Sequence, residues 1–469
     1  MVFNSLFFFT TLFIFLIFYF AFKDRQPKMV KIGTLIYSYF FYGMWNPAFL
    51  LLLMVSTIID YLTALGIEAN PRRKKPFLAI SLTTNLGLLG FFKYFNFFVD
   101  TAETLFKLVG INWTPPFFQV SLPVGISFYT FQTLSYTIDV YRGEINAKKS
   151  LIDIAFFVAF FPQLVAGPII RARDFLPQLM KNPVIRKENW VGGIGLILSG
   201  LFLKVVVADN VSDRVNFLFT NWEINGILEN WAAAMLFGVQ IYGDFSGYSL
   251  IAIGLAKIMG FHIPRNFNSP YTAAGFSDFW RRWHISLSTW LRDYLYISMG
   301  GNRKGTRRTY VNLMITMLLG GLWHGASFLF IAWGALHGFY LCIERLLKNQ
   351  LEKICFETVW VQRLLMMAGI LFTYIMVSLA WIPFRAETAE QGITMMIGLF
   401  HGKFSFYKNL GADYLVILVV FLFHSLTRRY DIFDLIENNG GFRFGTISVI
   451  LFSLYYFSGE RTDFIYFQF

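Results

Sequence analysis

Residues 6–22 read LFFFTTLFIFLIFYFAF, an apolar run that contains no charged side chain. Its length approaches the roughly 20 apolar residues with which an α-helix crosses the hydrocarbon core of a bilayer. No basic residue precedes the run, and no small-residue cleavage site follows it. We therefore expect a retained membrane helix here rather than a signal peptide that is removed.

The apolar character of this run extends along the whole chain. Of its 469 residues, 56% are hydrophobic and only 14% are charged, whereas about a quarter of the residues in soluble domains are charged. The composition predicts an all-α, polytopic integral membrane protein with one membrane-embedded domain over residues 1–469. Apolar runs lie at roughly 5–22, 32–44, 47–66, 77–99, 121–141, 151–170, 190–208, 228–257, 309–331, 329–347, 363–383, 412–426 and 443–458. Because several runs are too short or too long for one crossing, we expect about 10–12 transmembrane helices together with re-entrant segments.

The net charge of +12 indicates membrane orientation and not nucleic-acid binding, because Lys and Arg collect in the cytoplasmic loops of membrane proteins. The first basic cluster, at 23–31, follows the first apolar run directly. Placing this cluster in the cytoplasm predicts an N-terminus on the outer side. Runs 32–44 and 47–66 then form a hairpin around the WNP turn at 45–47. Run 151–170 has basic residues at both ends and is expected to dip into the membrane and return.

No metal site is expected from the sequence. The two cysteines, Cys342 and Cys355, have neither the spacing of zinc ligands nor that of a disulfide framework. The chain also contains no His-Glu-x-x-His motif, no phosphate loop and no Gly-x-Ser-x-Gly elbow. Chemistry must therefore come from other side chains.

The stretch from about residue 236 to 340 departs from the membrane pattern, because polar side chains stand between its apolar runs. They include Tyr242, Asp244, Ser246, Asn266, Asn268, Asp278, Arg281, Arg282, His284, Ser288, Arg292 and Asp293. Polar groups at membrane depth persist only where protein buries them or where they line a water-filled cavity. We expect residues 236–340 to form a catalytic core around such a cavity, in which Asp244 bonds a helix terminus or a basic partner.

His284 lies in the segment DFWRRWHIS at 278–286. Ser277 is a suitable N-cap for a helix through this segment. Such a helix places four side chains at four-residue steps on one face, namely Trp280, His284, Ser288 and Arg292. The four side chains then face the same cavity. An imidazole in that position is suited to proton transfer near neutral pH. The alternative is an amphipathic helix at the membrane interface, in which His284 has no chemical role.

His324 lies in the segment GGLWHGA at 320–326, within an apolar run. Glycines let a neighbouring backbone or a ligand approach closely, which favours a functional His324 with Trp323 beside it. The alternative is a packing histidine that is bonded to a backbone carbonyl. His337, in WGALHG at 333–338, is a third candidate, and a structural interhelical hydrogen bond is its preferred interpretation.

A basic group at 303–308 follows the GGN segment at 300–302. Together with Arg281, Arg282 and Arg292, it has the chemistry to bind the phosphates of a nucleotide-bearing donor on the cytoplasmic side. The alternative is an ordinary cytoplasmic loop that only fixes the orientation of the chain.

Several of these stretches are similar to the motifs of the membrane-bound O-acyltransferase family, close to its alginate O-acetylation branch. The matching segments are PQLVAGPI at 162–169, YGDFSGY at 242–248, NFNSPY at 266–271, residues 278–292, GGNR at 300–303, residues 320–325 and WGALHG at 333–338. The resemblance implies an all-helical fold around a central tunnel through a thinned membrane. It also implies catalytic histidines at His284 and His324, of which His324 matches the signature residue of the family.

The last residues, FIYFQF at 464–469, resemble the ends of alginate-type members. They also resemble the C-terminal motif of the small protein that accompanies the D-alanyl-transferring relative. The resemblance implies that a tyrosine carries the acyl group briefly, and the matching position is Tyr466. The alternative is an aromatic anchor at the membrane interface. Leu250 departs from the family pattern, because many relatives have an acidic residue there, and this leaves the substrate open.

The resemblance implies a bacterial inner-membrane O-acyltransferase that moves an acetyl group from a cytoplasmic thioester, acetyl-CoA, to an extracellular, alginate-like polysaccharide. No bound cofactor is expected. His324 is the expected general base, and His284 orients the attacking hydroxyl or stabilises charge on the thioester oxygen. The expected partners are membrane lipid, a periplasmic acetyltransferase and a polysaccharide synthase complex, with no nucleic acid. The alternatives are D-alanyl transfer to teichoic acid, a lipid-linked sugar transporter with a histidine proton relay, and a scaffold without activity.

Overall fold

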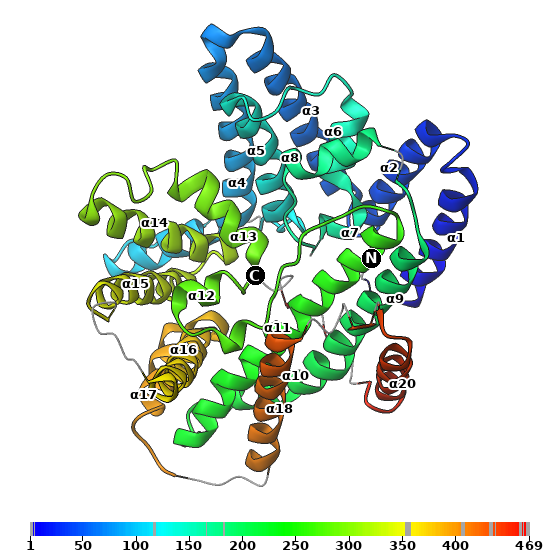
Figure 1. Cartoon of the computed structure of the whole chain (residues 1–469). Helices are drawn as coiled ribbons and strands as arrows, with labels where there is room; N and C mark the ends of the chain where they lie inside the picture. The colour runs from blue at the N-terminus through cyan, green and yellow to red at the C-terminus, as the bar shows by residue number, and fades with distance from the viewer. Residues whose placement is uncertain are drawn as a thin grey trace. The chain divides into compact units, whose positions relative to one another are not determined.

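The structure is a computed structural model, and each regular element among the residues that it describes is a helix (Figure 1). The described residues are 3, 5–115, 119–165, 167–181, 183–351, 358–404, 409–430, 435–436, 438–458, 462 and 464–465. This confirms the predicted all-α class.

The chain divides into two compact units. The first comprises Met1–Gly193 and Ala252–Pro264, and the second comprises Ile194–Ile251 and Arg265–Phe469. Two helices have residues in both units, namely α9 (Lys187–Leu201) and α11 (Ile227–Ile258). The other elements of the first unit are α1 (Leu6–Phe22), α2 (Pro27–Gly43), α3 (Pro47–Ala69), η1 (Pro71–Arg73), α4 (Lys74–Leu108), α5 (Ile126–Arg142), α6 (Leu151–Ala159), α7 (Phe161–Leu164), α8 (Ala172–Phe175) and η2 (Leu176–Met180).

The second unit continues along the chain with helices of very different lengths. They are η3 (Phe202–Ala208), α10 (Asp209–Thr220), η4 (Pro270–Thr272), α12 (Phe276–Trp280), α13 (Ile285–Trp290), η5 (Leu291–Tyr296), α14 (Thr306–His324), α15 (Phe328–Leu351), α16 (Val359–Arg385), α17 (Ala389–Gly398), α18 (Leu410–Arg429) and α20 (Gly440–Tyr456). The short elements from η4 to η5 fall inside the predicted polar core, whereas the long helices correspond to apolar runs.

Among the described residues, six helices are long and apolar enough to cross a membrane. They cover Pro47–Ala69, Pro71–Leu108, Lys187–Thr220, Phe328–Leu347, Val359–Arg385 and Leu410–Arg429. The chain is therefore a multi-pass membrane protein, as predicted. The larger number of about 10–12 crossings stays a prediction.

The expected turn between the second and third apolar runs is confirmed. Helix α2 ends at Gly43, and α3 begins at Pro47. The side chain of Asn46 accepts a hydrogen bond from the backbone N–H of Ala48 at 2.9 Å and so caps α3. Pro47 suits the first helical position, because an N–H group there has no intrahelical partner and proline has no N–H group to leave unpaired.

The apolar run at 151–170 forms the short helices α6 and α7 rather than one crossing helix. Nine residues of α6 rise only about 14 Å, whereas the hydrocarbon core is about 30 Å thick. Most of its side chains are buried in the first unit, from Ile154 to Ala159. The length of α6 is therefore compatible with a segment that enters the bilayer without crossing it.

A buried carboxylate joins three helices of the first unit. Asp60 of α3 is fully buried and accepts hydrogen bonds from Ser81 and Asn85 of α4. Thr137 of α5 donates a third at 3.2 Å. A charge inside a membrane protein is tolerated when several donors surround it, so this cluster fixes how α3, α4 and α5 pack.

Helices α14 and α15 pack side by side in the second unit (Figure 1). A Cβ atom on Gly321 would lie 2.2 Å from the carbonyl oxygen of Phe330, and one on Gly334 would lie 2.4 Å from that of Met317. Only glycine permits this approach of two backbones. The close contact sets the position of His324, the last residue of α14.

Candidate active site

The predicted single helix from Ser277 through Arg292 is wrong. Helix α12 ends at Trp280, and α13 begins at Ile285 after a turn. The residue at the N-cap of α12 is Gly275 and not Ser277, whose N–H and hydroxyl groups both donate to the carboxylate of Glu344.

The helix breaks because a second segment of chain supplies backbone hydrogen bonds. The N–H of Asn268 donates to the carbonyl of Arg282, and the N–H of Ile285 donates to the carbonyl of Asn266, each at 2.9 Å. His284 lies between these two bonds with a φ of 42°. This left-handed conformation costs roughly 1–2 kcal/mol for a residue with a Cβ atom, and the flanking bonds hold the residue in it.

The four side chains expected on one face therefore lie in different surroundings. The Trp280 ring packs 5.1 Å from the His337 ring. Ser288 donates to the carbonyl of Trp283, and the Arg292 side chain is 61% exposed and pairs with Asp293 at 2.6 Å. His284 alone among the four is fully buried.

Asn266 orients the imidazole of His284. Its Oδ1 atom lies 3.2 Å from Nδ1 of His284 and also accepts hydrogen bonds from the N–H and hydroxyl groups of Ser286. The Nδ2 atom donates to Ser249 Oγ at 3.2 Å, which supports this orientation of the amide. Because an amide oxygen only accepts, Nδ1 of His284 carries the proton and the lone pair is on Nε2.

The ring of His284 is held in its neutral form. Burial lowers the pKa of His284 to about 3, and its own backbone only partly opposes this shift. The group lies outside the six candidate spans. A neutral imidazole with a lone pair on Nε2 accepts a proton or a hydrogen bond, which favours the orienting role of His284 over stabilisation of charge by a cation.

His324 ends α14 and is 4% exposed. Its ring lies 5.0 Å from the rings of both Trp323 and Trp333. The Trp323 ring is also 5.8 Å from the ring of His284. The structure therefore brings the two predicted histidines into one aromatic cluster of the second unit, with Trp323 in contact with both.

Asp244 has the basic partner that the sequence predicted. Its carboxylate lies 2.8 Å from the ammonium group of Lys204, which also pairs with Asp209 at 2.8 Å. All three side chains are at most 3% exposed. One buried cation thus joins two buried carboxylates from α11 and from the start of α10.

The same carboxylates hold the described part of the C-terminal tail. The N–H of Ile465 donates to Asp244 at 2.6 Å, and Thr462 donates to Asp209. Phe464 is fully buried, and its ring lies 4.3 Å from the Tyr248 ring and 6.0 Å from the Phe245 ring. Phe245 in turn lies 4.6 Å from the ring of His284. Tyr466, the predicted acyl carrier, lies outside the described residues.

The arginines proposed for the donor phosphates have carboxylate partners or lie at the surface. Arg282 pairs with Asp278 at 2.9 Å, whereas the Arg281 side chain is 74% exposed. The basic group at 303–308 contains exposed side chains, including Arg303 and Lys304. Phosphate binding by these residues stays a prediction.

Three residues of this site have no assigned role from the sequence alone. Asn266 was only one of many polar residues in the core, although its place in the NFNSPY motif was a signal. Lys204 stands inside an apolar run, where a lone lysine indicates a buried counter-ion. A third, His424 of α18, is fully buried with its ring 4.4 Å from the Tyr242 ring, and no motif marks it.

A comparison with protein families identifies the family of the chain that carries this site. The model of MBOAT, the membrane-bound O-acyltransferase family, matches residues 32–382, a range that includes both histidines. This chain belongs to the membrane-bound O-acyltransferase family. It is therefore an enzyme, a membrane O-acyltransferase, and the transporter and scaffold alternatives are set aside.

Relatives of this O-acyltransferase modify different polymers. The chain is 41% identical to the probable alginate O-acetylase AlgI of Pseudomonas aeruginosa over 413 residues, which are 85% of this chain and 75% of the relative. It is 36% identical to the peptidoglycan O-acetyltransferase of Helicobacter pylori over 405 residues, or 80% and 74% of the two chains. It is 29% identical to the teichoic acid D-alanyltransferase of Bacillus subtilis over 236 residues, or 48% and 58% of the two chains.

The orienting role of Asn266 can be tested by substitution. Asn266→Ala removes the acceptor for Nδ1 of His284 and should lower acyl transfer about 10- to 100-fold through misorientation of the ring. Asn266→Asp keeps the acceptor and adds a negative charge, which raises the pKa of His284. The acidic limb of its pH–rate profile should therefore move to higher pH. Asn268→Ala, an exposed neighbour, is the control, and an unmoved profile in Asn266→Asp would contradict the role.

Proposed function

We propose that this enzyme transfers an acetyl group from a cytoplasmic thioester, acetyl-CoA, across the inner membrane for O-acetylation of an extracellular, alginate-like polysaccharide. The observation that carries the proposal is the aromatic cluster in which Trp323 contacts both His284 and His324. The choice of an acetyl group is supported by the names of the relatives that match 80% or more of the chain, which are O-acetylases and an O-acetyltransferase.

In the proposed reaction, His324 is the general base. The oxygen of the acceptor hydroxyl bonds to the thioester carbonyl carbon while His324 removes its proton, and the carbon–sulfur bond then breaks. The proton passes from His324 to the leaving thiolate, which leaves as free CoA. Positioned bases of this kind contribute about 10²–10⁴ in rate. His284, with its lone pair on Nε2, orients the hydroxyl.

The first acceptor in this proposal is the phenol of Tyr466. The tail residues before it support this, because Phe464 packs on Phe245, which contacts the ring of His284. Tyr466 follows Ile465, whose N–H is bonded to Asp244, and one residue spans at most about 3.6 Å of chain. A periplasmic acetyltransferase would then take the acetyl group from the tyrosine ester and pass it to the polymer made by a synthase complex.

D-alanyl transfer is the second candidate function. It is favoured by the match to a teichoic acid D-alanyltransferase, which covers 48% of this chain. In that case, the donor would be a D-alanyl thioester on a carrier protein. The acetyl proposal is preferred because the acetyl-transferring relatives match far more of the chain, 80–85%.

Isotope-labelled acetyl-CoA tests the proposal. The full-length enzyme in lipid nanodiscs is expected to release free CoA and to gain label at Tyr466, located by mass spectrometry of its peptides. Tyr466→Phe should abolish the protein label while leaving the fold intact. The same assay with a D-alanyl carrier thioester is the comparison. Release of CoA no faster than in protein-free nanodiscs, or labelling only by the D-alanyl donor, would overturn acetyl transfer.

A further inference from the structure

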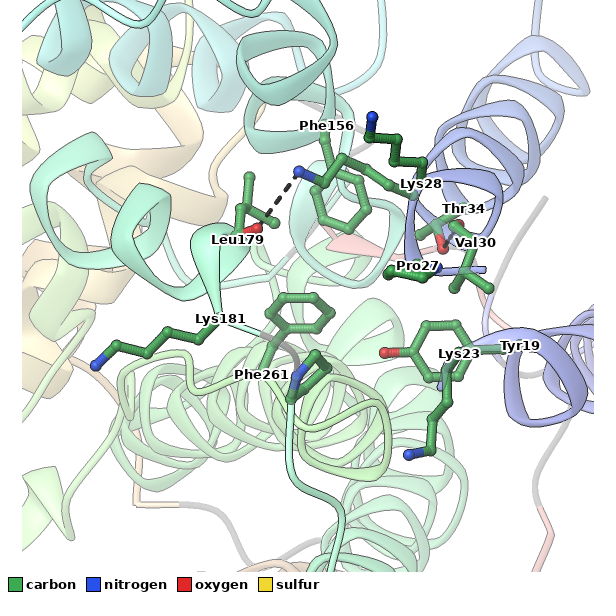
Figure 2. A pocket seen from close by; sticks show the side chains of 12 residues that line it. Tyr19, Lys23, Pro27, Lys28, Val30, Thr34, Phe156, Leu179, Lys181 and Phe261 are labelled. Atoms are coloured by element: carbon green, nitrogen blue, oxygen red, sulfur yellow. Dashed lines mark hydrogen bonds between the residues drawn. The ribbon is translucent and has the colours of Figure 1, made fainter. Parts of the chain in front are cut away.

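A pocket opens in the first unit where α1 ends and α2 begins (Figure 2). Its cavity volume is about 120 Å³. The end of α1 and the start of α2 supply side chains to it, and so do the segments before α9 and after α11. The residues that carry the argument are Tyr19, Lys23, Lys28, Lys31, Lys181 and Phe261.

The inner wall of the pocket is aromatic and tightly packed. Phe261 is 8% exposed and stacks on Phe175 with the ring centroids 5.5 Å apart, and it lies 5.7 Å from Phe156. The phenol of Tyr19 donates to the carbonyl of Met259 at 2.7 Å, which fixes its ring. The wall is therefore preformed and does not depend on a ligand.

The rim of the pocket carries four lysines. Lys31 pairs with Asp153 at 2.7 Å, and Lys23 pairs with its neighbour Asp24 at 2.8 Å. Lys28 and Lys181 are exposed and have no carboxylate partner among the described residues. Figure 2 shows the ammonium groups of Lys23, Lys28 and Lys181 on different sides of the opening. The flexible side chains of these lysines allow their ammonium groups to turn toward an anion. The charges of Lys28 and Lys181 have no carboxylate partner in the part of the chain that the structure describes, so a bound anion can pair with them.

An exposed apolar stripe on α2 leads directly to this rim. Ile32, Ile36 and Phe40 follow Lys28 at four-residue steps, which places all four residues on one face of the helix. The three apolar side chains are 44%, 62% and 42% exposed. In a membrane protein, such a stripe contacts lipid chains, and a lysine at its end extends to the headgroup level.

We propose that this pocket binds the phosphate headgroup of an acidic phospholipid, whose acyl chains lie along the α2 stripe. Basic pockets between membrane helices are known to bind acidic headgroups. The volume of about 120 Å³ is well below the roughly 300–1,000 Å³ of pockets for drug-sized ligands, so it suits a headgroup and not a nucleotide-bearing donor. The apolar stripe selects a lipid over a free phosphate ester, because only a lipid covers both surfaces.

Lipid binding can be counted without any acyl transfer, so its outcome is independent of the proposed function. The full-length enzyme in neutral detergent is titrated with phosphatidylglycerol or with phosphatidylcholine, and the bound lipid is counted by native mass spectrometry. Lys28→Gln combined with Lys181→Gln should weaken phosphatidylglycerol binding about 30-fold, because each lysine near the surface contributes about fivefold. Binding of phosphatidylcholine should not change. Higher salt should also weaken the phosphatidylglycerol binding of the unsubstituted enzyme.

The matched control is Lys75→Gln combined with Lys149→Gln. Both lysines are exposed in the same unit and lie outside the pocket, so this variant should bind phosphatidylglycerol like the unsubstituted enzyme. Equal weakening in the control variant would show a general charge effect and overturn the pocket. Inorganic phosphate that displaces the lipid at concentrations comparable to those of phosphatidylglycerol would show a site for soluble anions and overturn the lipid assignment.

Discussion

Replacing His324 with alanine is expected to lower acyl transfer about 10²–10⁴-fold, the contribution of a positioned general base. The loss should appear in the first-order rate of a single turnover, because the proposed first acceptor, Tyr466, belongs to the enzyme and the base acts on its proton only while its oxygen attacks. It is measured as release of CoA from acetyl-CoA by enzyme in nanodiscs, normalised to the amount of folded protein. In cells, the same substitution should remove acetylation of the polymer while protein abundance is unchanged.

The matched control is His337→Ala. His337 is also fully buried in the aromatic cluster, with its ring 4.7 Å from Trp333, and our proposal gives it no chemical step. Both variants delete the same atoms from similar packing, so they should lose similar amounts of stability. If His324→Ala and His337→Ala also lose activity equally, or if activity only follows folded protein, the role of His324 is packing.

The membrane helices were predictable because the bilayer allows few structures. Backbone polar groups in the hydrocarbon core must be bonded internally, so a long apolar run becomes a helix. The run predicted at 363–383 lies within α16, and the run at 412–426 lies within α18. The turn before α3 was also predictable, because Asn46 and Pro47 act locally as N-cap and first helical residue.

The break at His284 was not predictable from local pattern. The four-residue spacing of Trp280, His284 and Ser288 is compatible with a helix, and no glycine or proline interrupts it. The competing hydrogen bonds come from Asn266 and Asn268, which precede the segment in the chain. Glu344, which is far from Ser277 in the sequence, accepts hydrogen bonds from the N–H and hydroxyl groups of Ser277. These hydrogen-bond partners can be identified only from the tertiary structure. Helix propensity considers only the residues of the segment and not the contacts that other segments make with it.

The sequence selects the two histidines as candidates, a prediction that stays open, but it does not predict their surroundings. His284 and His324 stood out because imidazoles are rare among apolar runs. Trp323, which contacts both rings, is a candidate from the sequence only because it adjoins His324. The neutral state of His284 depends on burial and on the amide of Asn266, which are both properties of the folded chain.

The buried ion cluster links the fold to the proposed chemistry. Lys204 stands between Asp209 and Asp244, and the two carboxylates bond Thr462 and Ile465 of the tail. Lys204 also donates directly to the carbonyl of Thr462 at 3.0 Å. A single cation therefore pairs with both carboxylates that hold the chain on the N-terminal side of Tyr466. Loss of this cation should affect stability and tail position together.

Lys204→Met is expected to destabilise the second unit by about 3–5 kcal/mol, because it leaves two buried carboxylates without their cation. The measurement is thermal unfolding in detergent, with limited proteolysis to detect release of the tail. The triple variant Lys204→Met, Asp209→Asn and Asp244→Asn removes all three charges. It should recover most of the stability, since replacing a whole buried ion cluster by neutral groups is often close to neutral. Exposed Lys304→Met is the control, and a Lys204→Met variant as stable as this control would show that the cluster contributes no net stabilisation.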